Sequence, residues 1–395
     1  MDIQRLLSDR ARAIEASGIR RVFELGAKLK DPINLSIGQP DFPVPDEIKR
    51  AAIEAIELDR NGYTLTQGIP ELRERIEREL AHDLGWSFAD ASDPGVLVTS
   101  GTSGALLLAM LALVGPGDEF IIPDPYFVMY PHLAPICAGK AVRCETYPDF
   151  RMTAARIEPL ITARTKAVLF NSPGNPTGVV ASREECRDVL DLCRRRGVFL
   201  ISDEIYDGFV FEDGATDHAA KSPGDRRCPS PARAPGAGED VLVIRGFGKT
   251  YGVTGWRMGY AAGPRALLAE IAKLQQYTFV CAPSMAQWGC LAAFDADISG
   301  HVREYQSRRD MVVERLGAVT DLTAPAGAFY AFPRVPERLG LTATQLVARA
   351  VERNLLTIPG HVFSSRDTHL RLSFAAPREK LGRGLEILAE LLAGG

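Results

Sequence analysis

The sequence predicts an α/β fold in which a mainly parallel sheet is covered by helices on both faces. Short apolar, β-branched runs alternate with helix-like segments through the middle of the chain. Each run ends at a polar loop that contains glycine or proline, and the 395 residues are enough for a large core and two or more domains. In such sheets ligands gather at the carboxyl ends of the strands, so these loops are where chemistry is expected.

The elements follow from the apolar pattern. Five runs are expected to form strands of the sheet, at 96–99, 120–123, 167–170, 198–202 and 241–244. A glycine-containing turn at 100–104 and a helix-like run at 105–110 follow the first of them. Beyond residue 300 the pattern changes, and we expect helices at 303–316, 344–352 and 378–392 and a strand at 369–374.

Composition excludes several functional classes. A net charge of -4, without a long block of like charge, gives no reason to expect a nucleic-acid partner. The N-terminus lacks the apolar run of a secretory signal, and the longest apolar stretches, such as 105–114, are too short to span a membrane. The seven cysteines are dispersed and form no Cys-x-x-Cys pair, which favours reduced thiols and a cytoplasmic protein. The six histidines show no metal-ligand spacing, so no metal is expected.

The most informative segment surrounds Lys249. It reads Arg-Gly-Phe-Gly-Lys-Thr-Tyr-Gly-Val-Thr-Gly-Trp-Arg-Met-Gly over 245–259. Asn-Ser-Pro-Gly-Asn-Pro-Thr-Gly at 171–178 and Ser-Asp-Glu-Ile-Tyr at 202–206 precede it, and Leu-Arg-Leu-Ser-Phe at 370–374 follows it. A lysine in a glycine-rich run, with an asparagine, an Asp-x-x-Tyr and two arginines in this order, resembles the class I/II aminotransferases. These are fold-type I enzymes that use pyridoxal 5′-phosphate.

The resemblance implies a fold and a reaction. The fold is a large domain, with a mainly parallel seven-stranded sheet between helices, and a smaller α+β domain. We expect residues 1–45 to belong to the small domain as an N-terminal segment, 46–290 to form the large cofactor-binding domain and 291–395 the C-terminal small domain. The reaction is a ping-pong transfer of an amino group from an amino acid to a 2-oxo acid through a Schiff base, in a homodimer with shared active sites. Elimination or cyclisation at the same site, as in carbon–sulfur lyases and aminocyclopropane carboxylate synthases, is the alternative.

The resemblance also assigns catalytic roles. Lys249 would bind the cofactor aldehyde and, once displaced by substrate, move a proton between the substrate α-carbon and the cofactor. Asp203 would keep the pyridine nitrogen protonated, because a neighbouring carboxylate favours the charged form. Tyr206 and Asn175 would donate hydrogen bonds to the phenolic oxygen of the ring. The bond between residues 175 and 176 is a candidate cis peptide, since it precedes a proline.

The cofactor phosphate is expected at the turn that opens the first helix. Gly101 would allow close approach, and Thr102 and Ser103 would donate hydrogen bonds at the helix N-terminus. Arg257, eight residues after the lysine, matches the phosphate arginine of the family. Tyr63 resembles the tyrosine that reaches the phosphate across the dimer interface.

Substrate contacts are expected from both ends of the chain. Arg371 resembles the arginine that holds the substrate carboxylate, because a guanidinium offers a carboxylate two parallel hydrogen bonds. Asn175 would assist it. Gly38 resembles the N-terminal segment that closes over the substrate, and Ile37 would then line the side-chain pocket. Phe127 aligns best with the aromatic residue that stacks on the pyridine ring, and Tyr126 is the alternative.

The chain departs from the family pattern at three places. Gly246 stands where a serine with a phosphate-binding hydroxyl is common, so one contact is expected to be missing and the loop to be more flexible. Ser103 stands where one subgroup carries a lysine for a distal carboxylate, which lowers aspartate and glutamate as expected donors. Residues 212–240 are rich in glycine, proline, alanine and charge, and we expect a flexible surface insertion there, with a lid or contact loop as the alternative.

Overall fold

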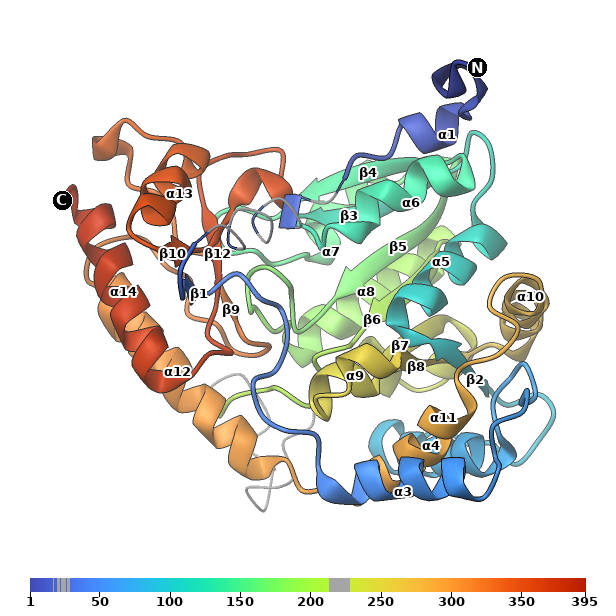
Figure 1. Cartoon of the computed structure of the whole chain (residues 1–395). Coiled ribbons are helices and arrows are strands. Elements are labelled where there is room, and N and C mark those ends of the chain that lie inside the picture. The colour runs from blue at the N-terminus through green and yellow to red at the C-terminus, as the bar shows by residue number, and fades with distance from the viewer. Residues whose placement is uncertain (17, 20–21, 23–25, 27–28, 213–227) are drawn as a thin grey trace.

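A seven-stranded sheet forms the centre of the larger part of the molecule (Figure 1). The computed structural model describes the chain except for residues 17, 20–21, 23–25, 27–28 and 213–227. The order of the strands is β2-β8-β7-β6-β5-β3-β4. β8 is antiparallel to both of its neighbours, and the other neighbouring pairs are parallel. This confirms the mainly parallel, seven-stranded sheet.

The strands run where the apolar runs predict them, with two additions. Their bounds are β2 (Gly95–Ser100), β3 (Glu119–Asp124), β4 (Lys140–Glu145), β5 (Thr165–Asn171), β6 (Phe199–Asp203), β7 (Val241–Gly246) and β8 (Met258–Gly263). β4 and β8 were not recognised from the sequence. β4 is an edge strand with three charged residues, and β8 consists largely of glycine and alanine, so neither has the β-branched apolar run that predicts a strand.

Alternate residues of the central strands enter two separate cores. Val168 and Leu200 pack on one face of the sheet, and their neighbours Leu169 and Ile201 pack on the other. Side chains alternate between the faces of a strand, so a sheet buried on both faces needs a continuous apolar run. The first face is covered by α3 (Asp46–Glu57), α4 (Pro70–Leu84), α8 (Arg183–Arg196) and α11 (Ser284–Ala293). The second is covered by α5 (Gly101–Leu113), α6 (Met129–Cys137) and α10 (Arg265–Gln276).

A smaller body holds roughly the last quarter of the chain, at the left of Figure 1. β11 (Ile358–Pro359), β12 (Leu370–Ser373) and β9 (Tyr330–Ala331) form an antiparallel sheet in that order. β1 (Ile33–Asn34) pairs in parallel with β10 (Leu355–Leu356), which joins the N-terminal segment to this body. Three helices cover it, α12 (Ser299–Gly317), α13 (Ala343–Glu352) and α14 (Arg378–Ala393), and they confirm the three that were expected. The exact division into domains stays a prediction.

Local sequence signals explain where helices begin and end. Ser182 and Glu185 form a capping box at the start of α8, and Gly197 ends the helix in the left-handed region at φ 64°. Thr342 and Gln345 form a second capping box at α13. The remaining short helices are η1 (Ile3–Leu6), α1 (Asp9–Arg12), α7 (Ala154–Ile157), η2 (Glu158–Leu160), α9 (Phe247–Thr250), η5 (Thr254–Trp256), η6 (Glu337–Leu339) and η7 (Gly360–Val362). Among the helices of the described residues, none has the length and apolarity to cross a membrane.

Residues 228–240 correct one expectation. Cys228, Ala232 and Ala237 are buried, and two turns of 3-10 helix, η3 (Pro231–Arg233) and η4 (Ala237–Glu239), run through the segment. The indole nitrogen of Trp86 donates to the carbonyl oxygen of Ala232 at 2.8 Å. This part of the expected insertion is therefore packed against the larger body and is not a flexible surface segment. The rest of that prediction falls on residues 213–227, outside the described residues.

Candidate active site

A cavity of about 290 Å³ lies beside the carboxyl ends of the central strands, between the two bodies. It brings together residues that the sequence predicts for one site although they are far apart in the chain. Those that line it are Gly38, Gly101, Thr102, Ser103, Phe127, Asn175, Asp203, Tyr206, Lys249, Arg257 and Arg371. The cavity therefore collects four of the predicted loops and both predicted arginines.

Lys249 projects into the cavity from α9, directly after β7. Its ammonium group donates a hydrogen bond to the carbonyl oxygen of Gly38. Burial, helped by the positive charges of Arg371 and Arg257, lowers the pKa of the amine from 10.5 to about 8. A fraction of the amine is therefore neutral near neutral pH, and a neutral amine is the form that attacks a carbonyl group.

Asp203 ends β6 and is only 3% exposed. The hydroxyl of Tyr130 donates to its Oδ2 at 2.7 Å, and the backbone N–H of Ile205 donates to Oδ1 at 3.3 Å. Burial raises the pKa of the carboxyl from 3.8 to about 6, and the Tyr130 hydroxyl opposes that rise. Within the described part of the chain, no lysine, arginine or histidine forms an ion pair with it. A buried carboxylate without a cation, facing a cavity, suits a cationic ligand.

Arg371, on β12, is a buried cation, whereas Asp203 is a buried carboxylate. Its side chain is 1% exposed and lies between the rings of Tyr330 and Phe363, whose centroids are 4.6 and 4.5 Å from the guanidinium carbon. Nη1 donates to Oδ1 of Asn175 at 3.1 Å, Nη2 donates to the carbonyl oxygen of Ser36 at 2.9 Å, and Nε has no partner. Burial lowers the pKa of the guanidinium. Among the described residues no carboxylate pairs with it, so the cavity offers a buried cation to an anion.

Asn175 and Tyr206 continue this chain of hydrogen bonds. Nδ2 of Asn175 approaches the Tyr206 hydroxyl at 3.5 Å, and that hydroxyl lies 2.9 Å from the hydroxyl of Tyr330. The bond between Asn175 and Pro176 is cis, as predicted. Asn175 of the larger body and Tyr330 of β9 thus both contact the hydroxyl oxygen of Tyr206.

The start of α5 forms the other end of the cavity. Gly101 opens the helix at φ 69°, in the left-handed region, and a Cβ atom there would lie 2.7 Å from Nη2 of Arg257. Arg257 itself has a φ of 57°, which a non-glycine residue adopts only where its surroundings hold it. The first N–H groups of a helix have no partner inside the helix, so they and this guanidinium together form a site for an anion such as phosphate.

Gly246 explains how the missing serine is accommodated. A Cβ atom at this position would lie 3.0 Å from Cδ1 of Ile205, 3.0 Å from Cγ2 of Thr102 and 3.2 Å from the carbonyl oxygen of Met258. The space for a serine side chain is therefore filled by two apolar side-chain ends and a backbone oxygen. The chain offers the Thr102 and Ser103 hydroxyls at the cavity but none from position 246.

Two predicted residues are not brought to the cavity. Tyr63 is 88% exposed and lies on a loop before α4. Ile37 is half-buried and does not line the cavity, although its neighbour Gly38 does. Of the two aromatic candidates for ring stacking, Phe127 lines the cavity, whereas Tyr126 is buried away from it.

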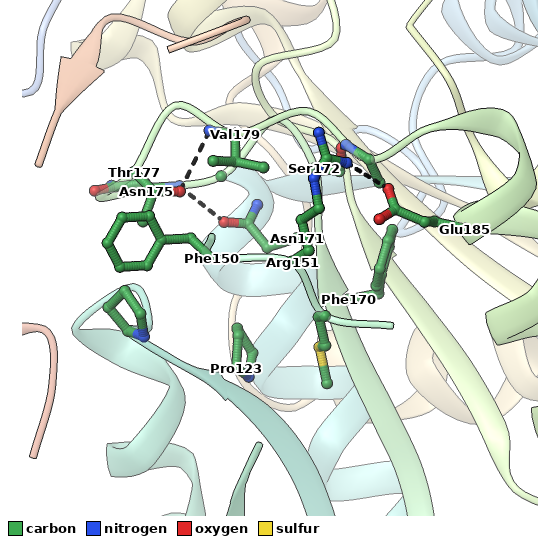
Figure 2. A pocket seen from close by; sticks show the side chains of 14 residues that line it. Pro123, Phe150, Arg151, Phe170, Asn171, Ser172, Asn175, Thr177, Val179 and Glu185 are labelled. Carbon is green, nitrogen blue, oxygen red and sulfur yellow. Dashed lines mark hydrogen bonds and ion pairs between the residues drawn. The ribbon is translucent and has the colours of Figure 1, made fainter. Parts of the chain in front are cut away.

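A second, smaller pocket adjoins the first (Figure 2). Asn171 and Asn175 line both pockets, and the side-chain oxygen of Asn171 accepts a hydrogen bond from the backbone N–H of Asn175 at 3.1 Å. At about 30 Å³ it has room for water and not for a cofactor. The larger cavity is therefore the candidate active site.

Sequence reasoning assigned no role to four polar residues of this cavity, namely Tyr130, Asn171, Thr254 and Tyr330. Tyr130 follows Phe127 by three positions on the loop and helix after β3, a spacing that places both on one side of a helical turn. That spacing was the available signal for it. Asn171 is the last residue of β5, and strand ends were already the expected location of function. Tyr330 belongs to a two-residue strand and carries no comparable signal.

Comparison with known proteins bears on the whole chain. The family model of aminotransferase class I and II matches residues 30–388. An aspartate aminotransferase of Pyrococcus abyssi is 32% identical, with 98% of each chain covered. An aromatic-amino-acid aminotransferase of Thermococcus litoralis is 31% identical, again with 98% of each chain covered. The solved structure of an aspartate aminotransferase from Thermus thermophilus with maleate is 32% identical and covers 98% of this chain and 99% of its own, with a TM-score of 0.87.

Proposed function

Because this chain belongs to the class I and II aminotransferases and is an aminotransferase, we propose that it transfers an amino group from an amino acid to a 2-oxo acid with pyridoxal 5′-phosphate held in the 290 Å³ cavity. The observation that carries this proposal is a pair of buried, unpaired opposite charges in one cavity with a lysine. Asp203 has no cationic partner and Arg371 no anionic partner within the described residues. Burying either charge is costly unless a ligand compensates it.

The cavity residues fit each part of this cofactor. A phosphate suits the start of α5, where Gly101 leaves room for Arg257 and where Thr102 and Ser103 line the wall. The pyridine nitrogen, when protonated, suits the carboxylate of Asp203. Once bound, pyridoxal 5′-phosphate supplies an aldehyde for the amino group and a ring that accepts the electrons left when the α-proton departs.

The chain's own residues then perform distinct tasks. Lys249, with its pKa lowered to about 8, holds and moves a proton at the substrate α-carbon. Arg371 binds the substrate carboxylate with its fork and so orients the α-carbon. Tyr206 and Asn175 would donate hydrogen bonds to the ring oxygen of the cofactor, and Phe127 would pack against its ring. A donor first loads the enzyme with an amino group, and an acceptor removes it by the same steps in reverse.

The proposed reaction is not restricted to one class of amino-acid donor. The described residues give this cavity three cations, Lys249, Arg257 and Arg371, and each is assigned to cofactor or carboxylate binding. The names of the relatives include both aspartate and aromatic amino acids. A donor screen across acidic, aromatic, aliphatic and small amino acids is therefore the appropriate survey.

We also propose a homodimer that completes the site. Tyr63 and Leu65, on the segment before α4, and Tyr277, on the segment after α10, are exposed apolar side chains. Gln275 ties the two segments together, because its Nε2 donates to the carbonyl oxygens of Thr66 at 2.6 Å and of Val98 at 3.0 Å. An exposed apolar surface of this kind suits a second copy, and Tyr63 would then reach the phosphate of the partner subunit. We propose a cytoplasmic location on the basis of the dispersed thiols.

The test combines spectroscopy with mapping. Purified protein loaded with pyridoxal 5′-phosphate is reduced with borohydride, digested and mapped, and the label is expected on Lys249. Each amino acid is then added to unreduced enzyme, and at least one is expected to remove the absorbance of the lysine-bound cofactor and yield its 2-oxo acid. Lys249→Ala should abolish both signals, whereas Lys273→Ala, at an exposed lysine paired with Glu270, should change neither. A label elsewhere, or release of ammonia with every donor that reacts, would overturn the proposal.

A further inference from the structure

Tyr330 lies against the cavity but has no task in the proposed reaction. It stands on β9, is 1% exposed, and its hydroxyl oxygen lies 2.9 Å from that of Tyr206. Gly38 covers this hydroxyl, since a Cβ atom on Gly38 would lie 2.5 Å from it. Within the described residues, Tyr206 is the hydrogen-bond partner that the hydroxyl of Tyr330 has.

A count of donors and acceptors gives this hydrogen bond a direction. A phenol has one hydrogen and two lone pairs, and burial raises the pKa of both phenols, so both keep their hydrogen at neutral pH. Oδ1 of Asn175 accepts from Arg371 at 3.1 Å, which leaves its Nδ2 to face the Tyr206 oxygen at 3.5 Å. One lone pair of the Tyr206 oxygen thus accepts from Asn175. If Tyr330 donates to the same oxygen, the second lone pair is also occupied, and the Tyr206 hydrogen can point into the cavity.

The opposite direction leaves groups unsatisfied. If Tyr206 donated to Tyr330, the hydrogen of Tyr330 would lie beneath Gly38 with no acceptor among the described residues, and the cavity would lose the hydrogen of Tyr206 as a donor. Buried polar groups are nearly always hydrogen-bonded, because an unmade bond costs the desolvation of the group. The first direction gives the hydrogen of Tyr330 an acceptor and leaves the hydrogen of Tyr206 for a ligand in the cavity.

We propose that Tyr330 donates its hydroxyl hydrogen to Tyr206 and thereby directs the hydrogen of Tyr206 into the cavity, which makes Tyr330 a positioning residue for the reaction. The inference rests on the proposed function, because the ring oxygen of pyridoxal 5′-phosphate is the acceptor that this hydrogen would meet. Tyr330 belongs to the smaller body and Tyr206 to the loop after β6, so the direction of one hydrogen depends on how the two bodies meet.

The consequence is a change in how the lysine-bound cofactor titrates. A donor to the ring oxygen competes with the proton on the lysine nitrogen for the charge of that oxygen. When Tyr206 donates well, the proton leaves the nitrogen at lower pH, and when the Tyr206 hydrogen is free to rotate, it leaves at higher pH. Asp203, Arg371 and Lys249 are the charged groups that face the two phenols, and a Tyr→Phe change leaves all three in place.

The experiment is a pH titration of the holoenzyme followed by the absorbance of the lysine-bound cofactor. Tyr330→Phe is expected to raise the midpoint by about half to one pH unit, as for the weakening of one buried hydrogen bond. Tyr206→Phe should raise it more. In the Tyr206→Phe background, Tyr330→Phe should add no shift, because the hydrogen that it directs is gone. Tyr147→Phe is the matched control, since it loses a hydrogen bond of 2.9 Å to Ser364 outside the cavity.

The outcomes separate the two proposals. If the wild-type protein forms no lysine-bound chromophore, the proposed function fails and the titration is not reached. If Tyr206→Phe shifts the midpoint and Tyr330→Phe does not, or if the Tyr330→Phe shift persists in the Tyr206→Phe background, the positioning role is refuted and the proposed function stands. Phenylalanine keeps the ring beside Arg371, so KM for the donor should stay within about twofold. A rise in KM together with a lower thermal midpoint would indicate a packing defect and refute the positioning role.

Discussion

Replacing Tyr130 by phenylalanine tests how the buried carboxylate of Asp203 is held. The hydroxyl of Tyr130 donates to Oδ2 of Asp203 at 2.7 Å, and its ring packs edge-on to Phe127 with centroids 5.6 Å apart. Phenylalanine keeps the ring contact and removes the hydroxyl alone. The change therefore isolates one hydrogen bond to one carboxyl group.

The size of the effect depends on the charge of Asp203. Folding raises its pKa from 3.8 to about 6, so the folded state favours the protonated form. This lowers the free energy of unfolding as pH rises between the two pKa values, by about 3 kcal/mol in total. A hydrogen bond to an ionised group contributes about 1.5–3 kcal/mol, and one to a neutral group about 1 kcal/mol. Tyr130→Phe should therefore cost about 1 kcal/mol near pH 4 and about 2–3 kcal/mol near pH 8.

Urea unfolding of the cofactor-free protein measures this difference. The free energy of unfolding is compared between wild type and variant across that pH range, and groups that titrate alike in both proteins, such as Asp207, cancel. Tyr147→Phe loses a hydrogen bond between two neutral groups, so its cost should not vary with pH. A Tyr130→Phe penalty that stays constant, or that shrinks as pH rises, would show that the hydroxyl does not stabilise the ionised form.

Three further substitutions probe other contacts. Arg371→Lys keeps the charge but loses the fork, and kcat/KM for the donor should fall roughly 30- to 150-fold in steady-state assays, mainly through KM; an unchanged KM would contradict carboxylate binding there. Asp124→Ala removes the acceptor of the 2.5 Å hydrogen bond that Ser364 of the smaller body donates to the larger body. The free energy of unfolding in urea should fall by about 2–4 kcal/mol, and a loss below about 1 kcal/mol would show the contact to be unimportant. Gly101→Ala places a Cβ atom 2.7 Å from Arg257 at a residue with positive φ. The Kd of pyridoxal 5′-phosphate, measured by fluorescence titration, should therefore rise tenfold or more, which is on the order of 1–2 kcal/mol. An unaltered Kd would argue against phosphate binding at this turn.

The larger body and much of the cavity were predictable from the sequence because their signals are local. Asn175, Asp203 and Lys249 each lie within a few residues of a buried apolar strand, and the strand pattern and the motif reinforce each other. Parallel strands deliver their carboxyl ends to one edge of a sheet, so residues that are distant in sequence become neighbours without any further signal.

The contacts between elements that are distant in the chain were not predictable in this way. Tyr130 meets Asp203 across 73 positions and Tyr206 meets Tyr330 across 124, and neither pair shares a motif or a period. Their partners are decided by how helices and the smaller sheet pack against the larger one. A single sequence records the side chains but not that packing.

Composition was misleading at 228–240 for a related reason. Glycine, proline and alanine are typical of flexible segments, yet they are also small enough to pack closely against a helix. The contacts that hold this segment come from elsewhere, through the indole of Trp86 and through Arg233, which binds Asp83 at 2.7 Å. Such long-range anchors outweigh local flexibility.

Because β1 pairs with β10, this enzyme needs both the beginning and the end of its chain to complete its fold. The backbone N–H groups of Ile33 and Leu35 donate to the carbonyl oxygens of Asn354 and Leu356, and the guanidinium of Arg371 donates to Ser36, 335 positions earlier in the chain. During synthesis the larger sheet can fold before the C-terminal segment that pairs with the first forty residues has been made. Carboxylate recognition is therefore assembled last, and a chain truncated before residue 371 would possess the lysine and its acidic neighbour yet lack the arginine that recognises a carboxylate.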